Sequence, residues 1–552
     1  MSSLSATLRR RRGLVGDGRM SPRKAFWSSF LAFFVISGLW AVNNPLMASV
    51  DEPAHMIKAA SVVLGSEDVS TDGGVTGIGL VEIPLLYNTI ATFANCLAFQ
   101  PEATASCQPE ITGDIEQIAT IPTSAVNYNP LYYAVVGLPA LIPDDGGEYT
   151  AYLMRLINAL VSSAVLALAV RTIAEMPRRR WMALGLLLPL TPTFINLTGS
   201  INPQSFEVTG SVLLWVTLLA LLRAPDPDVL ARRATRLVIA TTLVAHARGL
   251  GPFFVVLIVL LCVGTSPWKN LVALVRQRSA QIAIVLCVLS CALATAWILF
   301  GNALPDRAVG SGISDRDTFL YSAGNTSYYL NQLVAALGWL DVAFPTWFYM
   351  VYAALVGLMM FLGWAAGSWR DRLGIVVVSA LVLTLPIVIQ VAQAPTIGWF
   401  WQGRYIFPVA IGLTFLCALA IERRPRALDE RMTRNLVTTS AVVLVGLQVA
   451  ALVFNLHRYI NGGNGGWFKL DAESWLPPVN LVVLLVTYAA AWVAFAVIAL
   501  RAATPREARP ADEVVSSPTT GDLPPEGTPP VVPPEGAPLV QSADPRTAPG
   551  GS

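Results

Sequence analysis

The sequence predicts an all-α integral membrane protein with about twelve transmembrane helices. Of its 552 residues, 54% are hydrophobic and only 13% are charged, whereas soluble globular proteins carry about 25% charged residues. The apolar residues come in blocks of about 20, the length that a helix needs to cross a bilayer. Lipid offers the backbone no hydrogen-bond partner, so these blocks must be helical. A large soluble protein with buried helices is the alternative, and the low charge argues against it.

The N-terminal segment and the first apolar block set the expected orientation. Residues 1–24 contain a cluster of arginines, and basic residues mark the cytoplasmic side of a membrane protein. The block Ala25–Val42 is long and lacks the small-residue cleavage site that follows a signal peptide. We therefore expect it to remain as the first span.

A long outer loop, residues 44–148, follows that span. Within it, Asn129–Ile142 is too short to cross the bilayer comfortably, so we expect an interfacial helix there. Cys96 and Cys107 lie in the same loop with ten residues between them. Outside the cytoplasm these two cysteines favour a disulfide, and two free thiols are the alternative.

Basic clusters that alternate along the chain give the remaining topology. The expected spans after the loop are 149–174, 181–198, 204–222, 236–247, 250–264, 280–300, 343–366, 373–392, 405–421, 435–456 and 479–500. The stretch 236–264 is divided at Arg248 because only two crossings return the chain to the cytoplasm before the next basic cluster. These spans complete a membrane domain of residues 25–500. The Pro-rich tail, residues 501–552, is expected to be disordered and, like the N-terminus, cytoplasmic.

The strongest candidate for chemistry is the segment Asp51-Glu52-Pro53-Ala54-His55, directly after the first span. Ionisable residues near the membrane are costly and often functional. A helix that starts here would bring the two carboxylates and the histidine to one face, and Pro53 suits its first turn. A helix cap at Asp51 is the structural interpretation. The functional alternative is a base, or a metal site of Asp51, Glu52 and His55, whose donors suit Mg²⁺ or Mn²⁺.

Three further segments accompany this motif: Asn129-Pro130-Leu131-Tyr132-Tyr133, Ile201-Asn202-Pro203-Gln204-Ser205, and Gln402-Gly403-Arg404-Tyr405-Ile406-Phe407-Pro408. With a first span that leads directly into an acidic motif, the chain resembles the GT-C superfamily of membrane glycosyltransferases. The motifs resemble those of a bacterial group of polytopic membrane proteins named only as a domain of unknown function. The resemblance covers roughly residues 25–500 and implies a GT-C-like fold with interfacial helices in the first outer loop.

The resemblance also implies an activity. Enzymes of this superfamily transfer a sugar from a polyprenyl-phosphate donor, here to a glycan, lipid or protein acceptor of the cell envelope. Asp51 matches their catalytic base, and Glu52 would assist it or bind a metal. Many of these enzymes use Mg²⁺ or Mn²⁺, while others need none. The active site would lie on the extracytoplasmic face of the cell membrane, in contact with membrane lipids.

Such a reaction needs fixed cations to hold the departing phosphate. Arg404 and Arg248 fall at outer turns between helices, and a guanidinium binds phosphate through two donors. Arg155 lies about one turn inside the span 149–174, where it would face the lipid phosphate or pair with one of the two carboxylates. A snorkelling arginine in an interfacial aromatic belt is the structural alternative for Arg404.

Eight residues of the same outer segments are candidates for contacts with the substrates, as hydrogen-bonding groups or as rings that stack on a sugar. They are His55, Tyr128, Asn129, Asn202, Gln204, Trp401, Gln402 and Tyr405. Turn and helix-cap roles for the polar members, and an interfacial aromatic belt for the rings, are the alternatives.

Two other functions share these features. A transporter or flippase for a lipid-linked intermediate would place charged residues deep in paired spans, whereas here they concentrate in the outer loops. A ligase or polymerase of lipid-linked glycans uses a similar outer site with a diphosphate donor. Basic residues line the cytoplasmic edge instead of an aromatic-studded face, which argues against nucleic acid as a partner.

Overall fold

The computed structural model describes residues 20–66, 78–142, 148–177, 179–300, 312–424, 429–467 and 474–504. The predicted cytoplasmic N-terminus is therefore described only from Met20, and the predicted disordered tail only as far as Thr504. The rest of these two segments lies outside the described residues.

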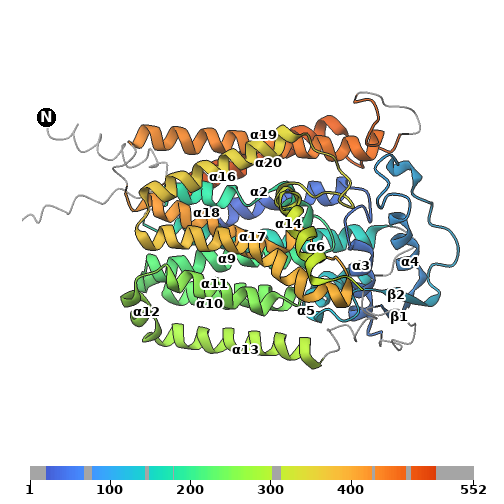
Figure 1. Ribbon diagram of the computed structural model, residues 1–552. Coiled ribbons are helices and arrows are strands. Elements are labelled where there is room, and N and C mark those ends of the chain that lie inside the picture. The colour runs from blue at the N-terminus through green and yellow to red at the C-terminus, as the bar shows by residue number, and fades with distance from the viewer. Residues whose placement is uncertain are drawn as a thin grey trace, which may run out of the picture. The chain divides into compact units, whose positions relative to one another are not determined.

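Long helices that lie side by side form most of the structure (Figure 1). Within the described ranges, nine helices are long and apolar enough to cross a bilayer. They are α2 (Pro22–Asn43), α6 (Tyr149–Ala174), α9 (Gln204–Arg223), α13 (Arg278–Phe300), α16 (Thr346–Ala366), α17 (Trp369–Ile397), α18 (Phe407–Glu422, preceded by the 3₁₀ turn η5, Gly403–Ile406), α19 (Glu430–Asn461) and α20 (Leu481–Ala502). The chain is a multi-pass membrane protein, as predicted.

The other three predicted spans are helical but do not meet the same criterion, so the predicted count of twelve is not confirmed. The span expected at 181–198 is a pair, α7 (Arg180–Leu187) and α8 (Pro192–Thr198), bent by 71°. Prolines within a helical block remove a backbone donor and interrupt the helix, and Pro189 lies in this break. The stretch predicted to cross twice is indeed two helices, α10 (Leu230–Ala247) and α11 (Gly251–Gly264).

Helix α9 forms the centre of the bundle. It is buried along its apolar length and packs against α6, α10, α11 and α18, while α2 packs against α6 and α20. The contact of α9 with α18 is close, because a Cβ atom on Gly412 would lie 2.1 Å from the ring of Trp215. Trp215 Nε1 also donates to the Pro408 carbonyl over 2.8 Å. These contacts fix the start of α18 relative to α9.

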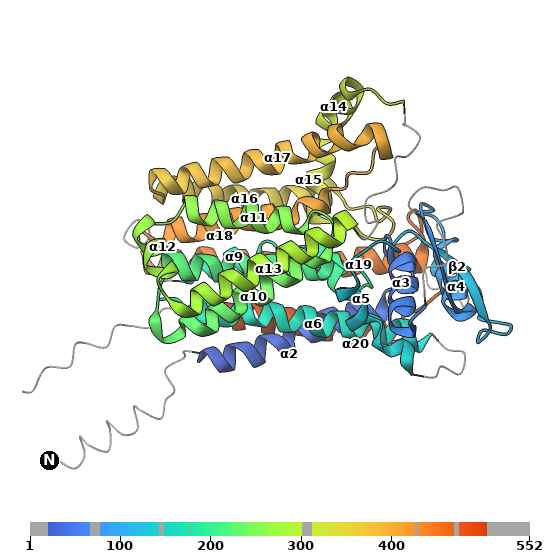
Figure 2. The same cartoon turned by 90° about the horizontal axis from the view of Figure 1, so that it is seen from below.

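One end of the bundle carries the long segment between α2 and α6, and we call it the Asp51 end (Figures 1 and 2). This segment contains α3 (Glu52–Leu64), β1 (Gly79–Pro84), α4 (Leu85–Ala91), β2 (Ile118–Thr123) and α5 (Pro130–Val136). The strands pair antiparallel with Gly79 opposite Thr123. This small sheet was not predicted. The predicted helix over 129–142 is shorter than expected and continues after Gly137 only as a 3₁₀ turn.

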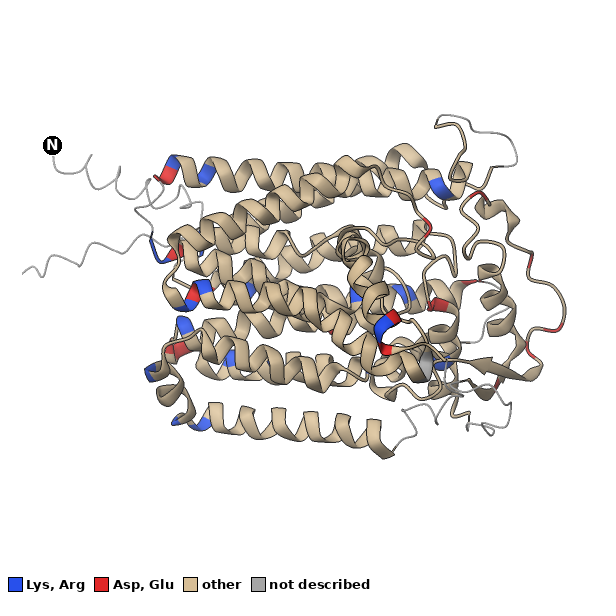
Figure 3. Cartoon of the chain, viewed as in Figure 1, with Lys and Arg blue, Asp and Glu red and all other residues tan. Residues whose placement is uncertain are grey.

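Other short elements complete the described chain: η1 (Thr92–Ala94), η2 (Ala105–Cys107), η3 (Leu138–Leu141), η4 (Pro227–Val229), α12 (Trp268–Val275), α14 (Asp315–Gly324) and α15 (Thr326–Val334). Cys96 and Cys107 are joined by a disulfide. Lys and Arg gather mainly at the end of the bundle opposite the Asp51 end (Figure 3).

Candidate functional site

Asp51 has an unusual backbone conformation directly before α3. Its φ of 66° and ψ of −5° place it in the left-handed region, which Asp tolerates better than most residues other than glycine. Asp51 occupies the N-cap position, but its side chain makes no capping hydrogen bond within the described chain. Asp51 is therefore the N-cap residue by position, as the structural interpretation expected, but its side chain does not cap the helix. Its carboxylate is turned away from the helix and is available for other contacts.

The carboxylate of Asp51 pairs with Arg404 from a segment 353 residues further along the chain. Asp51 Oδ2 accepts from Arg404 Nη2 over 2.5 Å. The Asp51 side chain is 43% exposed, whereas that of Arg404 is only 5% exposed. Burial raises the pKa of Asp51, but the positive charge of Arg404, with a smaller contribution from Arg248, lowers it below its usual range. Asp51 is therefore an accessible carboxylate that is ionised at neutral pH.

Arg404 is held by predicted substrate-binding residues. Gln402 Oε1 accepts from Arg404 Nε over 2.7 Å, and Gln204 Nε2 donates to the Arg404 carbonyl over 2.7 Å. Asn202 Oδ1 accepts from the Gln204 backbone over 3.0 Å at the start of α9. Gln402 therefore orients the guanidinium of Arg404, and Gln204 holds the Arg404 backbone. Asn202 supports this arrangement through the backbone of Gln204.

The backbone next to Arg404 is fixed by α15. Gly403 donates its N–H to Gln332 Oε1 over 2.5 Å. A Cβ atom at Gly403 would lie 1.9 Å from the carbonyl oxygen of Tyr329, so a side chain at this position would displace α15 or η5. The glycine in the Gln402–Pro408 motif is thus required by close packing.

A second guanidinium lies beside the first. The Cζ atom of Arg248 is 4.1 Å from the centre of the Tyr405 ring, and that of Arg404 is 5.4 Å from the same ring. Arg248 also interacts with Tyr128. Among the described residues, no carboxylate lies within 4.0 Å of Arg248. A partly buried guanidinium that no carboxylate contacts directly can still bind an anionic ligand.

The remaining aromatic and polar candidates have structural contacts. His55 Nδ1 lies 2.8 Å from the Tyr133 hydroxyl, and its ring meets the edge of Tyr128. Burial lowers the pKa of His55 to about 3, so this imidazole is neutral. Trp401 is buried and packs edge-on against Tyr405. Asn129 caps α5 through the N–H of Leu131.

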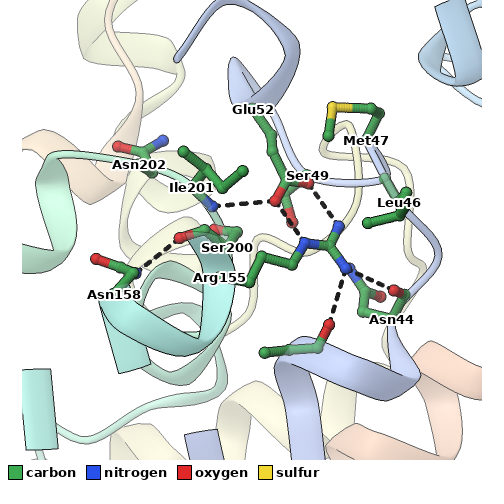
Figure 4. A network of polar contacts seen from close by, with 12 residues as sticks. Asn44, Leu46, Met47, Ser49, Glu52, Arg155, Asn158, Ser200, Ile201 and Asn202 are labelled. Atoms are coloured by element: carbon green, nitrogen blue, oxygen red, sulfur yellow. Dashed lines mark hydrogen bonds and ion pairs between the residues drawn. The ribbon is translucent and has the colours of Figure 1, made fainter. Parts of the chain in front are cut away.

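Glu52, the residue after Asp51, forms a fully buried ion pair with Arg155 (Figure 4). Arg155 Nε and Nη2 donate to the two carboxylate oxygens of Glu52, each over 2.7 Å. The other three N–H groups of Arg155 donate to the carbonyls of Ala41, Asn44 and Pro45. All five donors of the guanidinium are therefore used.

This pair corrects two sequence-based assignments. Arg155 has no donor left for a lipid phosphate and is not exposed, so the predicted phosphate role does not fit its position. Glu52 accepts from Arg155 and also from the backbone N–H of Ile201 over 3.0 Å, so its two oxygens are occupied and the predicted role as assistant to Asp51 or metal ligand does not fit its position. The pair instead ties the end of α2 and the start of α3 to α6 and to the turn before α9.

Residues 33–413 match the family described as "Predicted membrane protein (DUF2142)", which is more than half of the chain. The chain belongs to the DUF2142 family. The description of this family names a membrane protein and no activity, and no curated protein matches the chain. Asp51, Arg248 and Arg404 all lie inside the matched residues, so the whole site belongs to the DUF2142 part of the chain.

The predicted metal ligands of this DUF2142 protein do not form a metal site. Glu52 is occupied by Arg155, and His55 is directed to Tyr133. Across the described ranges, no group of three or more His, Cys, Asp or Glu side chains is arranged to hold a metal ion. The residues present therefore do not fit the predicted set of Asp51, Glu52 and His55 for Mg²⁺ or Mn²⁺.

Sequence reasoning missed Glu207 in this DUF2142 protein. Glu207 lies in the first turn of α9, is 1% exposed, and its Oε2 has no hydrogen-bond partner among the described residues. It is within electrostatic range of Arg248 and Arg404. The available signal was an acidic residue inside an apolar block, which is costly in a membrane.

Proposed function

We propose that this DUF2142 protein is an inverting membrane glycosyltransferase. It would transfer a sugar from a polyprenyl-phosphate carrier to a glycan, lipid or protein acceptor of the cell envelope. One observation carries the proposal: an accessible, ionised Asp51 is paired with Arg404 and lies in the electrostatic field of a second guanidinium, Arg248, which contacts no carboxylate among the described residues. A general base and fixed cations are the two kinds of group that this reaction needs.

The proposed step is a direct displacement. The Asp51 carboxylate takes the proton of an acceptor hydroxyl while the acceptor oxygen attacks the anomeric carbon of the donor. The bond between that carbon and the phosphate oxygen breaks on the opposite face, which inverts the anomeric centre. Polyprenyl phosphate leaves with the bonding electron pair, and Arg404 and Arg248 stabilise its growing charge.

An apolar cavity supports a lipid-linked donor. It has a volume of about 390 Å³ and lies between the α7–α8 break and α15 to α18. Leu333, Val356 and Phe407 are among its apolar lining residues, and Phe407 follows Arg404 by only three positions. We assign the end of the polyprenyl chain nearest the phosphate to this cavity.

The distribution of charge supports the orientation. Basic residues are concentrated at the end of the bundle opposite the Asp51 end (Figure 3), and the positive-inside rule assigns that end to the cytoplasm. The Asp51 end is then extracytoplasmic, and both termini of the chain are cytoplasmic.

Transfer of a radiolabelled sugar by the purified protein in liposomes tests this function. We expect label from a polyprenyl-phosphate sugar to appear on acceptors extracted from the cell envelope, with release of polyprenyl phosphate. Movement of the labelled lipid across the bilayer without transfer would support a flippase instead. Transfer only from a diphosphate donor would support a ligase or polymerase.

Replacement of Arg404 by Gln should raise the KM for the donor about tenfold or more, because a charge-assisted contact with phosphate is lost. It should also move the acidic limb of the rate–pH profile to higher pH. Arg404 lowers the pKa of Asp51, so the base loses its proton only at higher pH when Arg404 is absent. Steady-state rates between pH 4 and 8 measure both effects.

Arg316→Gln is the matched control, since Arg316 is an exposed arginine of α14 and the same charge is removed. An Arg404→Gln protein with the KM and pH profile of this control would contradict the phosphate role.

A further inference from the structure

A second, more polar hollow opens beside Arg248. It has a volume of about 240 Å³ and lies between the end of α10, the last turns of α13 and residues 124–129. Its lining includes Ser124, Asn127, Tyr128, His246, Arg248 and Trp297. We call it the Arg248 pocket. None of these residues lines the apolar cavity between α15 and α18.

The Arg248 pocket adjoins the candidate active site. Tyr128 lines the pocket and meets the ring of His55, which lies four residues after Asp51. Arg248 lines the pocket and stacks over Tyr405, next to Arg404. A ligand in the pocket therefore lies against the same guanidinium that faces the Asp51–Arg404 pair.

The charge of Arg248 indicates an anionic ligand. Three buried arginines at the Asp51 end have carboxylate partners: Arg155 pairs with Glu52, Arg404 with Asp51, and Arg458 with Asp341. In the part of the chain that the structure describes, Arg248 has no such partner within 4.0 Å. A guanidinium in this environment binds phosphate through parallel N–H donors.

The rest of the lining suits a sugar. Trp297 and Tyr128 contribute aromatic rings to the lining, while Asn127 and Ser124 contribute polar groups of the kind that hydrogen-bond hydroxyls. Trp297 Nε1 donates to the Asn127 carbonyl over 3.1 Å, which anchors the 124–129 segment to α13. The volume of about 240 Å³ leaves room for a sugar ring.

We propose that the Arg248 pocket binds a single sugar unit that carries a phosphate group, with Arg248 as its counter-ion. The assignment rests on the proposed transferase function for its biological role, but the binding itself needs no turnover. The ligand is either the head of a lipid-linked donor or a water-soluble sugar phosphate. In both cases the enzyme would handle one sugar at a time.

Calorimetric titration of the full-length protein in lipid nanodiscs tests the pocket. The probes are hexose 1-phosphate, free hexose, inorganic phosphate, and a short-chain isoprenyl-phosphate hexose. Measurements use the Asp51→Asn chain, so that no transfer takes place. Arg248→Gln and Asn127→Ala are added to this background, with Arg316→Gln as the matched charge control.

We expect the sugar phosphates to bind at least tenfold more tightly than hexose or phosphate alone. Arg248→Gln should weaken their binding about tenfold or more, Asn127→Ala should weaken it less, and Arg316→Gln should leave it unchanged. Tighter binding of the isoprenyl form identifies the donor head as the ligand, and equal binding of both forms identifies a soluble sugar phosphate.

Equal affinity in the Arg248→Gln and Arg316→Gln proteins would overturn the proposal. Binding of sugar phosphate without any transfer by the wild-type protein would overturn the transferase function and leave the pocket intact.

Discussion

Replacement of Asp51 by Asn is expected to abolish sugar transfer while the protein still folds. Asparagine has nearly the same shape as aspartate, and its side-chain oxygen still accepts from Arg404, but it cannot take a proton from the acceptor. Loss of a general base typically lowers rates by about 10²- to 10⁴-fold. Transfer from a polyprenyl-phosphate sugar, measured at equal amounts of purified protein, reports the effect.

Asp114→Asn provides the matched control, because Asp114 is an exposed carboxylate in the same segment between α2 and α6. We expect this variant to keep the wild-type rate. An Asp51→Asn protein that transfers sugar as fast as Asp114→Asn would remove Asp51 from the mechanism.

The second large effect concerns stability. Arg155→Met should lower the free energy of unfolding by about 3–5 kcal/mol, because it leaves the buried Glu52 carboxylate without its partner. It also removes the donors to three backbone carbonyls. Glu52→Gln should destabilise as well, since the cation then lacks its counter-charge. The double variant, Arg155→Met with Glu52→Gln, should lose less than the sum of the two single losses.

Denaturant titration of the purified protein in mixed micelles measures these losses. The pair of Arg180 and Glu430 is the matched control, because its N–O distance of 2.9 Å also makes it an ion pair, but its Glu430 side chain is 80% exposed. Arg180→Met should change the free energy of unfolding by no more than about 1 kcal/mol. An Arg155→Met loss as small as that of Arg180→Met would show that the buried pair does not hold this end together.

The long apolar helices were predictable because length and hydrophobicity are local properties of the sequence. The span expected at 181–198 instead bends by 71° between α7 and α8, where prolines interrupt an otherwise apolar block. The break at Arg248 was predicted from the alternation of charge, and the structure places it between α10 and α11. The strands β1 and β2 were missed because their pairing joins segments 34 or more residues apart through contacts that no local pattern encodes.

The candidate site was predictable only in part. Placing Asp51 and Arg404 at outer turns favoured their proximity, and the structure pairs them. The sequence placed Arg155 inside a span and Arg248 at an outer turn, but it left the partner of Arg155 open between a lipid phosphate and a carboxylate. In the structure Glu52 and backbone carbonyls use all the donors of Arg155, whereas no carboxylate among the described residues contacts Arg248. That distinction depends on how three distant segments pack. Glu207 was overlooked because it lies within a block that is otherwise typical of a membrane span.

Labelling of a cysteine at position 51 in intact cells tests the account most directly. The Asp51→Cys chain is treated with a membrane-impermeant thiol reagent, and the wild-type chain gives the background from its free cysteines. We predict that the reagent modifies Cys at this position without permeabilisation, and that a polyprenyl-phosphate sugar slows the modification. Modification only after the membrane is permeabilised, or at a rate that the donor does not change, would contradict an extracytoplasmic donor site at Asp51.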